Sequence, residues 1–247
     1  MKVSIITVSF NAAKTISATL SSVASQTYPH IEHIVVDGGS TDGTQNVVKG
    51  FQHVAKFISE PDKGLYDAMN KGLAISTGEI VVILNADDFY AHAGIIYKVV
   101  ECFKHQQVDI VYGDLVYVNA DYTKIIRNWK AGYFHRNKFY QGWMAPHPTF
   151  FVKRECYLKL GYFDTSLKYA ADYELMLRFM FKHHITNFYL PETLVIMKSG
   201  GKSNASLLNR LYINREDRRA WTINHLQPHL FTLILKPLRK LTQYINL

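Results

Sequence analysis

A short apolar run in the first half of the chain ends abruptly in two adjacent carboxylates. Residues 80–84 are all apolar and mostly β-branched, which is typical of a strand buried on both faces of a sheet. Asn85, Ala86, Asp87 and Asp88 follow directly. Open α/β sheets bind ligands at the carboxyl ends of their strands, and hard divalent cations favour carboxylate oxygens. The pattern therefore indicates a metal-binding active site, with a solvated acidic turn as the structural alternative.

Strand-like and helix-like segments alternate through the first half of the chain. Expected strands cover residues 2–8, 34–36, 57–59, 80–84 and 110–112, and expected helices cover about 15–26, 44–51 and 66–75. This alternation predicts βαβ units and a mostly parallel sheet, so the expected fold class is α/β. Right-handed crossovers would bring the loops after these strands to one edge. The polar residues gathered there would be Ser9, Asn11, Asp37, Ser40, Asp62, Asp87 and Asp88.

The second half is less regular, and its C-terminal end is basic. Asp172 begins a helix-like segment, and residues 194–196 are strand-like. From His225 onward, large aliphatic and aromatic residues alternate with basic ones, and Pro237 would kink any helix there. Two interpretations of this tail stay open. It is either an interfacial segment that touches an anionic membrane, or a C-terminal helix whose apolar face packs on the domain.

The bulk properties of the chain favour some partners and compartments over others. A net charge of +8 over 247 residues, with a pI of about 9.3, favours anionic partners. No RNA-binding signature, zinc finger or heptad run accompanies this charge, so nucleic acid is not an expected partner. Cys102 and Cys156 cannot build a disulfide framework, which favours a reducing compartment. Without a signal-peptide pattern or a run that could span a bilayer, we expect a cytoplasmic protein. An interfacial tail would add peripheral contact with the inner face of the membrane.

Four stretches of the chain resemble glycosyltransferase family 2, in the family's order and at suitable spacing. They read VSIITVSFN at 3–11, VVDGGSTDGT at 35–44, GLYDAMNKG at 64–72 and LNADD at 84–88. The resemblance is close to the bacterial enzymes that build O-antigen and exopolysaccharide repeats. It covers roughly the first two hundred residues and leaves the basic tail outside. It implies a GT-A fold, in which a Rossmann-like, mixed and mostly parallel sheet is flanked by helices.

The resemblance also implies how the chain is divided and what it does. Residues 1–224 would form the GT-A domain, with a nucleotide-binding half at 1–115 and an acceptor half at 116–224. Residues 225–247 would form the basic amphipathic tail. The implied reaction is an inverting transfer from a nucleotide sugar, expected to be UDP-linked, to a saccharide or lipid-linked saccharide. Mn²⁺ or Mg²⁺ would be the cofactor, and the product would belong to a bacterial surface polysaccharide.

The family pattern assigns roles to the acidic residues. Asp88 would hold the metal in the family's DXD-type motif, and Asp87 would assist it or bind the ribose hydroxyls. Asp172 matches the catalytic base in position and context, with Glu174 as the neighbouring alternative. The structural alternative for Asp172 is a helix N-cap, because Asp is favoured there. His147 would contact the diphosphate or the acceptor, with a structural histidine as its alternative.

Further residues would hold the nucleotide. Thr7, Ser9 and Asn11 would lie beside the base, partly through backbone groups, unless they only cap the strand. Other donor contacts would come from Asp37, Ser40 and Asp62. The chain departs from the commonest family pattern at Gly38, where a second aspartate often contacts the base. It departs again at Asn85, where the metal motif often begins with aspartate.

Two other functions remain open on the sequence. A sugar-nucleotide nucleotidyltransferase shares the fold and the metal, but it needs a Gly-rich, Arg-containing loop after the first strand. Residues 9–14 contain neither Gly nor Arg. A non-catalytic sugar-binding protein of the same fold would have no need of Asp87, Asp88 and Asp172, which are all present. We therefore expect a glycosyltransferase.

Overall fold

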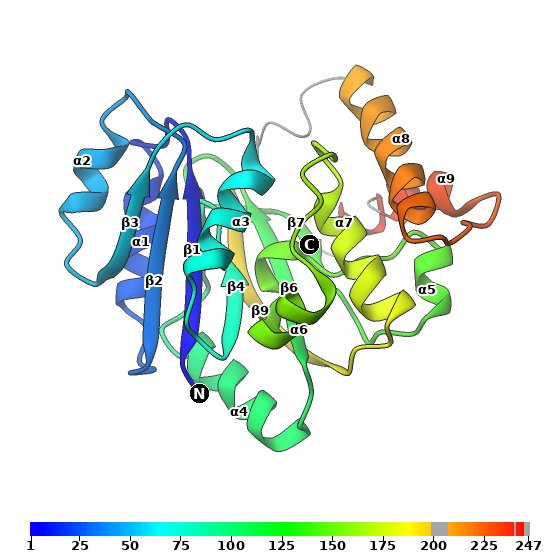
Figure 1. The fold of residues 1–247 in the computed structure, drawn as a ribbon, viewed down its shortest axis with the longest axis horizontal. Helices are drawn as coiled ribbons and strands as arrows, with labels where there is room; N and C mark the ends of the chain where they lie inside the picture. Colours follow the sequence, from blue (N-terminus) through cyan, green and yellow to red (C-terminus); the bar gives the residue numbers. More distant parts are fainter. Residues whose placement is uncertain (199–206, 240, 245–247) are drawn as a thin grey trace.

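The first half of the chain folds as the sequence predicts. The computed structural model describes residues 1–198, 207–239 and 241–244. Its first seven elements are β1 (Val3–Ser9), α1 (Ile16–Ala24), β2 (Ile31–Asp37), α2 (Thr44–Lys49), β3 (Val54–Ser59), α3 (Leu65–Ile75) and β4 (Ile80–Ile83). β1 pairs in parallel with both β2 and β4, and β2 pairs in parallel with β3. The predicted alternation is confirmed, and the carboxyl ends of these strands share one edge of the sheet (Figure 1).

The second half adds longer-range pairing that the sequence pattern only partly predicts. The strands are β5 (Asp88–Tyr90), β6 (Ile110–Val118), β7 (Ile125–Trp129), β8 (Phe151–Lys153) and β9 (Asn187–Lys198). The helices are α4 (Ile95–Gln106), α5 (Asn137–Tyr140), α6 (Arg154–Leu160), α7 (Ala171–Met176), α8 (Leu207–Ile223) and α9 (Thr232–Arg239). Short turns of helix cover His147–Thr149 and Leu241–Tyr244, and a π-helical segment, Leu177–Lys182, continues α7.

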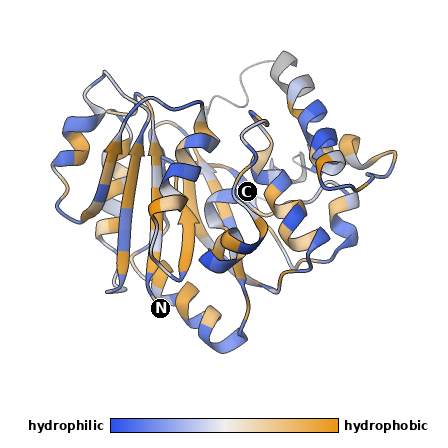
Figure 2. Cartoon of the chain, viewed as in Figure 1, coloured by the Kyte–Doolittle hydropathy of each residue, from blue (hydrophilic) through white to orange (hydrophobic). Residues whose placement is uncertain are grey.

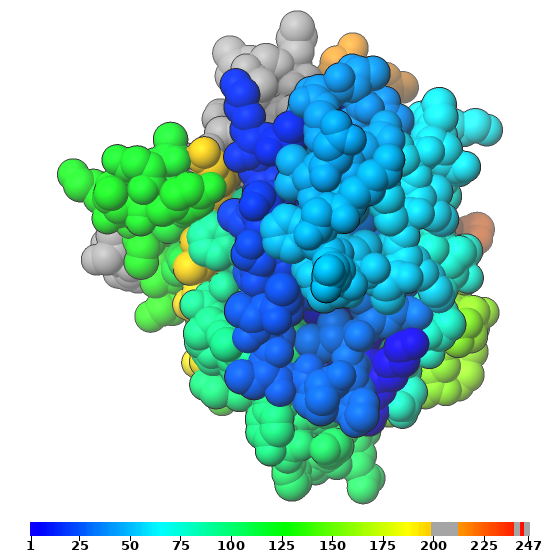
Figure 3. All heavy atoms as spheres, turned by 90° about the vertical axis from the view of Figure 1, so that its left-hand side faces the viewer, coloured from blue at the N-terminus to red at the C-terminus, as the bar shows by residue number. Residues whose placement is uncertain are grey.

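All the described strands belong to one mixed sheet. Its order is β3-β2-β1-β4-β8-β6-β9-β5, with β7 paired to β6. β8 runs antiparallel to both of its neighbours, and β5 runs antiparallel to β9. The hairpin of β6 and β7 projects from the body of the molecule (Figure 3). The second carboxylate of the acidic segment belongs to Asp88, which is the first residue of strand β5 and pairs with Met197 of β9.

Helices cover both faces of the sheet, so its strands are apolar on both sides (Figure 2). On one face, Ile6 and Val8 pack against α3 and the helices of the second half. On the other face, Val3 and Ile5 pack against α1 and α4. This arrangement explains why the strand after Gly78 is a continuous apolar run rather than an alternating one. No helix among the described residues is long and apolar enough to cross a membrane.

The C-terminal helices pack on the short helix α7. Glu216 of α8 accepts hydrogen bonds from the backbone N–H groups of Lys168, Tyr169 and Ala170, at 2.9, 2.7 and 3.1 Å. The Trp221 indole N–H donates to the Tyr173 hydroxyl at 3.0 Å. α8 therefore stabilises the loop that leads into α7, and with it the position of residue 172. α9 packs beside α8 and α5 (Figure 1).

Candidate active site

The carboxylate pair after β4 lies in a buried environment. Asp88 is fully buried, and its Oδ2 accepts a hydrogen bond from the Asn85 side-chain amide at 2.9 Å. Asp88 Oδ1 and Asn85 Oδ1 are both buried and have no hydrogen-bond partner within the described residues. Burial raises the pKa of Asp88 well above its usual range, and the charge of Asp87 raises it further, against the hydrogen bond from Asn85. An ionised carboxylate in such a place requires a compensating cation.

These oxygens fit a divalent cation. Asp88, Asp87 and the Asn85 amide are hard oxygen donors, and the two unpartnered oxygens are the feature that a metal ion would satisfy. Among the described residues there is no group of three or more His, Cys, Asp or Glu side chains that could enclose a metal. A cation here would therefore complete its coordination with oxygens from a ligand and from water.

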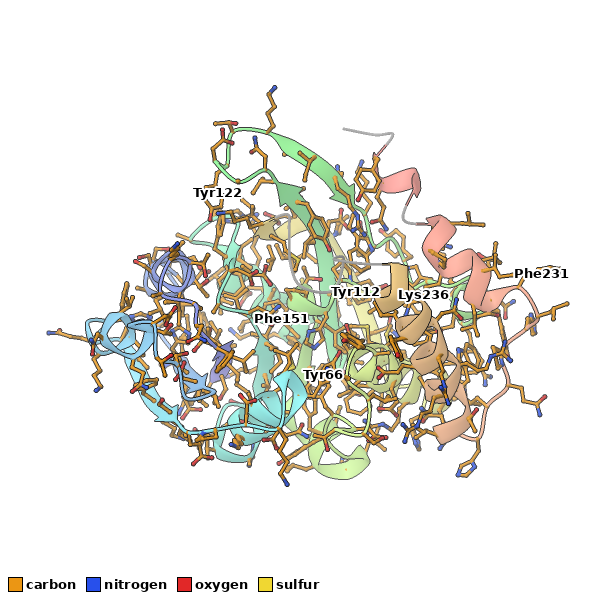
Figure 4. All side chains as sticks on the ribbon, turned by 90° about the horizontal axis from the view of Figure 1, so that it is seen from above. Tyr66, Tyr112, Tyr122, Phe151, Phe231 and Lys236 are labelled. Carbon is orange, nitrogen blue, oxygen red and sulfur yellow. The ribbon has the colours of Figure 1, made fainter. Side chains whose placement is uncertain are left out.

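Lys198, the last residue of β9, lies next to the carboxylate pair. Burial raises the pKa of Asp87, and the positive charge of Lys198 opposes this shift. The Lys198 ammonium group lies 5.3 Å from the centre of the Tyr122 ring, at the tip of the β6–β7 hairpin (Figure 4). Phe89 contacts the same ring edge-on, at 5.6 Å. The hairpin and the end of β9 thus border the site next to Asp87.

Asp172 lies in the first turn of α7 and is held by two hydrogen bonds. The Tyr66 hydroxyl of α3 donates to Asp172 Oδ1 at 3.1 Å, and the Tyr173 backbone N–H donates to the same oxygen at 2.8 Å. Asp172 Oδ2 has no hydrogen bond among the described residues. The residue that caps α7 is Ala170, and no side chain caps this helix. The N-cap alternative for Asp172 is therefore not what the structure shows.

His147 lies near Asp172. Its side chain is half-buried, and its ring contacts Phe163 edge-on at 5.5 Å. Burial lowers the pKa of His147, whereas the negative charge of Asp172 raises it. A neutral imidazole with a carboxylate in electrostatic reach can accept or donate a hydrogen bond to a polar ligand. The structure therefore brings His147 to the side of the site that holds Asp172.

Tyr117 connects the two ends of the site. Burial raises the pKa of its phenol to about 12, and the nearby Arg127 lowers it. The negative charges of both Asp88 and Asp172 raise it further. Both carboxylates must lie within electrostatic reach of one hydroxyl, although they are far apart in the sequence. The β5 carboxylate and the α7 carboxylate therefore both act on the same phenol.

At the end of β2, Asp37 organises the neighbouring loops. Its carboxylate is fully buried and accepts hydrogen bonds from the side chains of Ser9, Ser40 and Ser59 and from the Ser40 backbone N–H. Burial alone would raise the pKa of Asp37, but these hydrogen bonds, led by those from Ser40, outweigh it and lower the pKa. Because its carboxylate accepts four hydrogen bonds, Asp37 shapes the loop and has little capacity left for a ligand.

Asn11 connects the same loops across the strand ends. Its backbone N–H donates to Ser40 Oγ at 2.7 Å, and its side-chain oxygen accepts from the Thr41 backbone N–H at 3.0 Å. Its φ of 51° lies in the left-handed region, which asparagine tolerates better than most residues. Ser9, Asn11, Asp37 and Ser40 are thus brought together, as predicted. They form one hydrogen-bonded rim.

The absence of a side chain at Gly38 makes room for Asp62. A Cβ atom at Gly38 would lie 2.4 Å from Asp62 Oδ2 and 3.2 Å from the Phe10 ring. Asp62 Oδ1 accepts a hydrogen bond from the Gly64 backbone N–H at 2.8 Å. The Asp62 carboxylate therefore occupies the space that a side chain at position 38 would fill. Phe10, which is 55% exposed, lies beside it.

Two predicted site residues do not face this space. Thr7 is fully buried, and its hydroxyl lies 3.0 Å from Nε2 of His33 within the sheet. Glu174 is buried, and its carboxylate accepts two hydrogen bonds from Arg178 and one from Asn224, each at 2.9 Å. Both side chains are buried and hydrogen-bonded within the protein. The roles predicted for Thr7 through its side chain and for Glu174 at the acceptor do not agree with this geometry.

Sequence reasoning missed residues that build the site from other elements. Tyr66 lies within the stretch at 64–72, so the family resemblance contained a signal for it. Tyr117 and Lys198 lie on strands whose pairing is not visible from local pattern, and only the sheet register places them near Asp88. Glu216 stands among arginines on α8, and nothing in its local sequence indicates that it binds the loop before Asp172.

Comparison with known proteins agrees with this architecture. A family model described as "Glycosyl transferase family 2" matches residues 4–164. A protein of Mycobacterium bovis named "PGL/p-HBAD biosynthesis glycosyltransferase" is 26% identical over 217 residues, covering 86% of this chain and 82% of that protein. An uncharacterized glycosyltransferase of Mycobacterium tuberculosis is 33% identical over 186 residues, covering 71% of this chain and 68% of that protein.

Solved structures share the same fold. The S. aureus TarS fragment 1–349 in complex with UDP-GlcNAc has a TM-score of 0.71 at 18% identity, covering 95% of this chain and 69% of that chain. The mannosyltransferase PcManGT of Pyrobaculum calidifontis, in complex with GDP-Man and Mn²⁺, has a TM-score of 0.67 at 23% identity. It covers 95% of this chain and 68% of that chain.

The sheet, its flanking helices and the acidic strand end together define a GT-A glycosyltransferase fold. Within that class, the chain belongs to glycosyltransferase family 2. The expected fold and family are therefore confirmed, and the protein is a glycosyltransferase.

Proposed function

We propose that this protein is an inverting, metal-dependent glycosyltransferase that takes its sugar from a nucleoside-diphosphate donor. UDP is the nucleotide we favour, because two of the similar TarS structures carry UDP-GlcNAc or UDP. The Mn²⁺ in the mannosyltransferase complex supports the metal. The acceptor we propose is a saccharide or lipid-linked saccharide of a bacterial surface polysaccharide such as O-antigen. The enzyme would use it at the inner face of the cytoplasmic membrane.

The observation that supports this most directly is the buried carboxylate of Asp88, whose Oδ1 has no hydrogen-bond partner among the described residues, at the carboxyl end of the parallel strands. Asp88 and Asp172 both influence the pKa of the same phenol, that of Tyr117. Displacement at an anomeric carbon needs a charge-stabilising group on the leaving-group side and a base on the attacking side. A carboxylate pair suited to a cation and a separate carboxylate, that of Asp172, whose Oδ2 accepts no hydrogen bond from the part of the chain that the structure describes, meet those two needs.

Asp172 is the base in this proposal. The acceptor hydroxyl oxygen forms a bond to the anomeric carbon while the bond from that carbon to the diphosphate oxygen breaks. The hydroxyl proton passes to Asp172 Oδ2, and the Tyr66 hydroxyl keeps Oδ1 in place. A divalent cation bound by Asp88 and Asp87 would stabilise the negative charge that accumulates on the leaving diphosphate.

The rim at the ends of β1, β2 and β3 would bind the nucleoside. Phe10 presents an exposed ring on which a base can stack. Asp62 would take the place of the aspartate that family members often carry at position 38, because its carboxylate fills that space. Ser9, Asn11, Asp37 and Ser40 would hold the rim in shape, with Asn11 and Ser40 nearest to the ligand. Thr7 would contribute only through its backbone.

A panel of nucleotide sugars, each incubated with the protein in Mn²⁺ or in EDTA, tests the proposal. We expect one donor to release nucleoside diphosphate in Mn²⁺, faster when a saccharide acceptor is present, and to release none in EDTA. A nucleotidyltransferase would instead release pyrophosphate from a nucleoside triphosphate and a sugar phosphate. Donor binding by calorimetry without any release, over a broad acceptor panel, would favour the non-catalytic alternative.

A further inference from the structure

Unlike an ordinary surface helix, helix α9 buries a lysine and exposes most of its large apolar residues. Thr232, Leu233 and Lys236 are buried against the domain. The large apolar residues of α9 and of the turn before it are exposed instead: Leu230 by 83%, Phe231 by 62%, Ile234 by 56%, Leu235 by 36% and Leu238 by 50%. A helix that only packs on a domain places its apolar face inward.

The buried face determines the rotation of α9. The Lys236 ammonium group lies 2.5 Å from Asp217 Oδ1 of α8 and 3.6 Å from the centre of the Tyr173 ring. Asn214 of α8 donates to the Leu233 carbonyl oxygen at 3.2 Å. Rotating the helix to bury the leucines would expose Lys236 and leave Asp217 buried without its cation, which is strongly unfavourable. The outward apolar face is therefore a fixed feature of the fold.

The exposed residues form one continuous stripe. Residues 234, 235 and 238 lie on one side of α9, because residues three and four apart share a helix face, and residues 230 and 231 lie in the turn directly before it. Figure 4 shows Phe231 at the outer edge of the molecule, away from Lys236. Other exposed apolar side chains, such as Leu158 on α6 and Tyr97 on α4, belong to separate elements. We call residues 230, 231, 234, 235 and 238 the α9 stripe.

The charge around the α9 stripe indicates what covers it. From Arg218 to Leu247 the sequence contains five Lys or Arg residues and no Asp or Glu. Arg218 and Arg219 are exposed on α8, the helix on which α9 packs. An apolar stripe on a protein of net charge +8, with exposed arginines on the adjoining helix, complements the interface of an anionic bilayer, where acyl chains lie below acidic headgroups. A helix of this length lies in that interface and does not cross it.

We propose that the α9 stripe docks this protein on an anionic membrane surface. This docking does not require the proposed catalytic activity, and it gives that activity a location. Lys236 joins the docked helix to Tyr173, the neighbour of Asp172, so the membrane would lie on the α7 side of the molecule. A sugar acceptor carried on a lipid would then be presented near the proposed base.

Vesicle flotation of the whole protein tests the docking. The vesicles contain either phosphatidylcholine alone or phosphatidylcholine with about one third phosphatidylglycerol. Two double variants remove parts of the stripe, Leu230→Ser with Phe231→Ser and Ile234→Ser with Leu238→Ser. The matched control is Leu158→Ser, which removes an equally exposed leucine, 56% accessible, from α6. Thermal melting of every variant checks that the fold is intact.

We expect the wild type and Leu158→Ser to float with the anionic vesicles and much less with the neutral ones. Each double variant should bind the anionic vesicles at least about tenfold more weakly, because two large apolar contacts are lost. Equal flotation of the stripe variants and the wild type would overturn the proposal, as would a wild type that binds neither vesicle. A wild-type dimer in light scattering that the same variants dissociate would assign the stripe to self-association instead.

Discussion

At the scale of single residues, the aspartates of the candidate site differ in burial and in the hydrogen bonds that they accept. Among the described residues, Asp88 is buried with one oxygen unpartnered, whereas Asp172 is half-buried and has one oxygen without a hydrogen bond. Asp37, equally buried, accepts four hydrogen bonds and has become a structural residue. Three aspartates near the edge of one sheet thus differ in how many of their lone pairs the protein already uses.

The substitution Asp172→Asn tests the proposed role of Asp172 as the base without changing the proposed donor-binding residues. We expect the transfer rate to fall about 10²- to 10⁴-fold, because an amide cannot take the acceptor proton. Donor affinity measured by calorimetry should stay close to that of the wild type. Glu155→Gln, the same change at an exposed position of α6, serves as the control and should leave both quantities unchanged. Transfer at the wild-type rate in Asp172→Asn would exclude Asp172 as the base.

At the scale of elements, α8 holds the helix that carries the proposed base. Glu216 accepts hydrogen bonds from the backbone N–H groups of residues 168–170, in the loop that leads to Asp172. Hydrogen bonds from neutral donors to a charged acceptor are stronger than neutral ones. The position of Asp172 therefore depends on a residue far along the chain that does not touch it.

For Glu216→Ala we expect both lower stability and slower transfer. Losing three charge-assisted hydrogen bonds should destabilise the fold by roughly 2–4 kcal/mol and lower the melting temperature by about 4–12 °C. The transfer rate measured well below that temperature should also fall, because the loop before α7 is no longer held. Arg218→Ala, at an exposed neighbouring position, is the control. If Glu216→Ala melts lower but turns over normally, the clamp stabilises the fold without positioning Asp172.

The elements also show how far the sequence alone could lead. β1 to β4 and the helices between them were predictable, because each is a local pattern and right-handed crossovers fix their relation. β5 has only three residues and is a strand because β9 pairs with it, over a hundred residues later. Its register is what places Asp88 near Tyr117, and no local pattern contains that information.

The neighbourhood of Ser9, Asn11, Asp37 and Ser40 was predictable for the same reason. Residues at the ends of local strands, such as Ser9, Asp37 and Asp87, were expected near one another because parallel strands share an edge. The role of each of these residues was not predictable, since it depends on which hydrogen bonds each side chain makes. The tail shows a further limit. Its hydrophobic spacing left two interpretations open, and the buried pair of Lys236 and Asp217 determines which face points outward.

At the scale of the whole molecule, a buried histidine of β2 makes the free energy of unfolding depend on pH. His33 of β2 is fully buried between Thr7 and His53, at 3.0 and 2.9 Å. Burial, and then the neighbouring His53, lower the pKa of His33 to about 3 from its usual 6.5. Between those values the unfolded chain binds a proton that the folded one does not. The contribution of His33 is therefore complete above pH 6.5 and is lost as the pH falls towards 3.

The variant His33→Gln should flatten this acid dependence. Each proton bound only by the unfolded chain costs about 1.4 kcal/mol per pH unit, so the wild type should lose about 2 kcal/mol between pH 6.5 and 5 through this group. Unfolding free energies from urea titration at several pH values measure it. His30→Gln, at an exposed position, is the control and should keep the wild-type slope. An unchanged slope in His33→Gln would show that another group carries the effect.

The proposed function gives the molecule two sides with different roles. The strand edge with Phe10, Asp62 and the carboxylate pair would receive the donor, and the α7–α9 side would face the acceptor and the membrane. Asp172 lies where these sides meet, since it contacts α3 through Tyr66 and belongs to the helix on which α8 and α9 pack. Donor and acceptor can then approach from different directions.

The most direct test of this account is the metal dependence of donor binding, measured by calorimetry on the wild type and Asp88→Asn. We expect the wild type to bind its nucleotide-sugar donor in Mn²⁺ at least about tenfold more tightly than in EDTA, because the cation bridges protein and diphosphate oxygens. Asp88→Asn should bind with the weak affinity in both conditions. Equal affinity of the wild type with and without metal, or full metal-dependent affinity in Asp88→Asn, would contradict the central claim that this strand end is the metal and donor site.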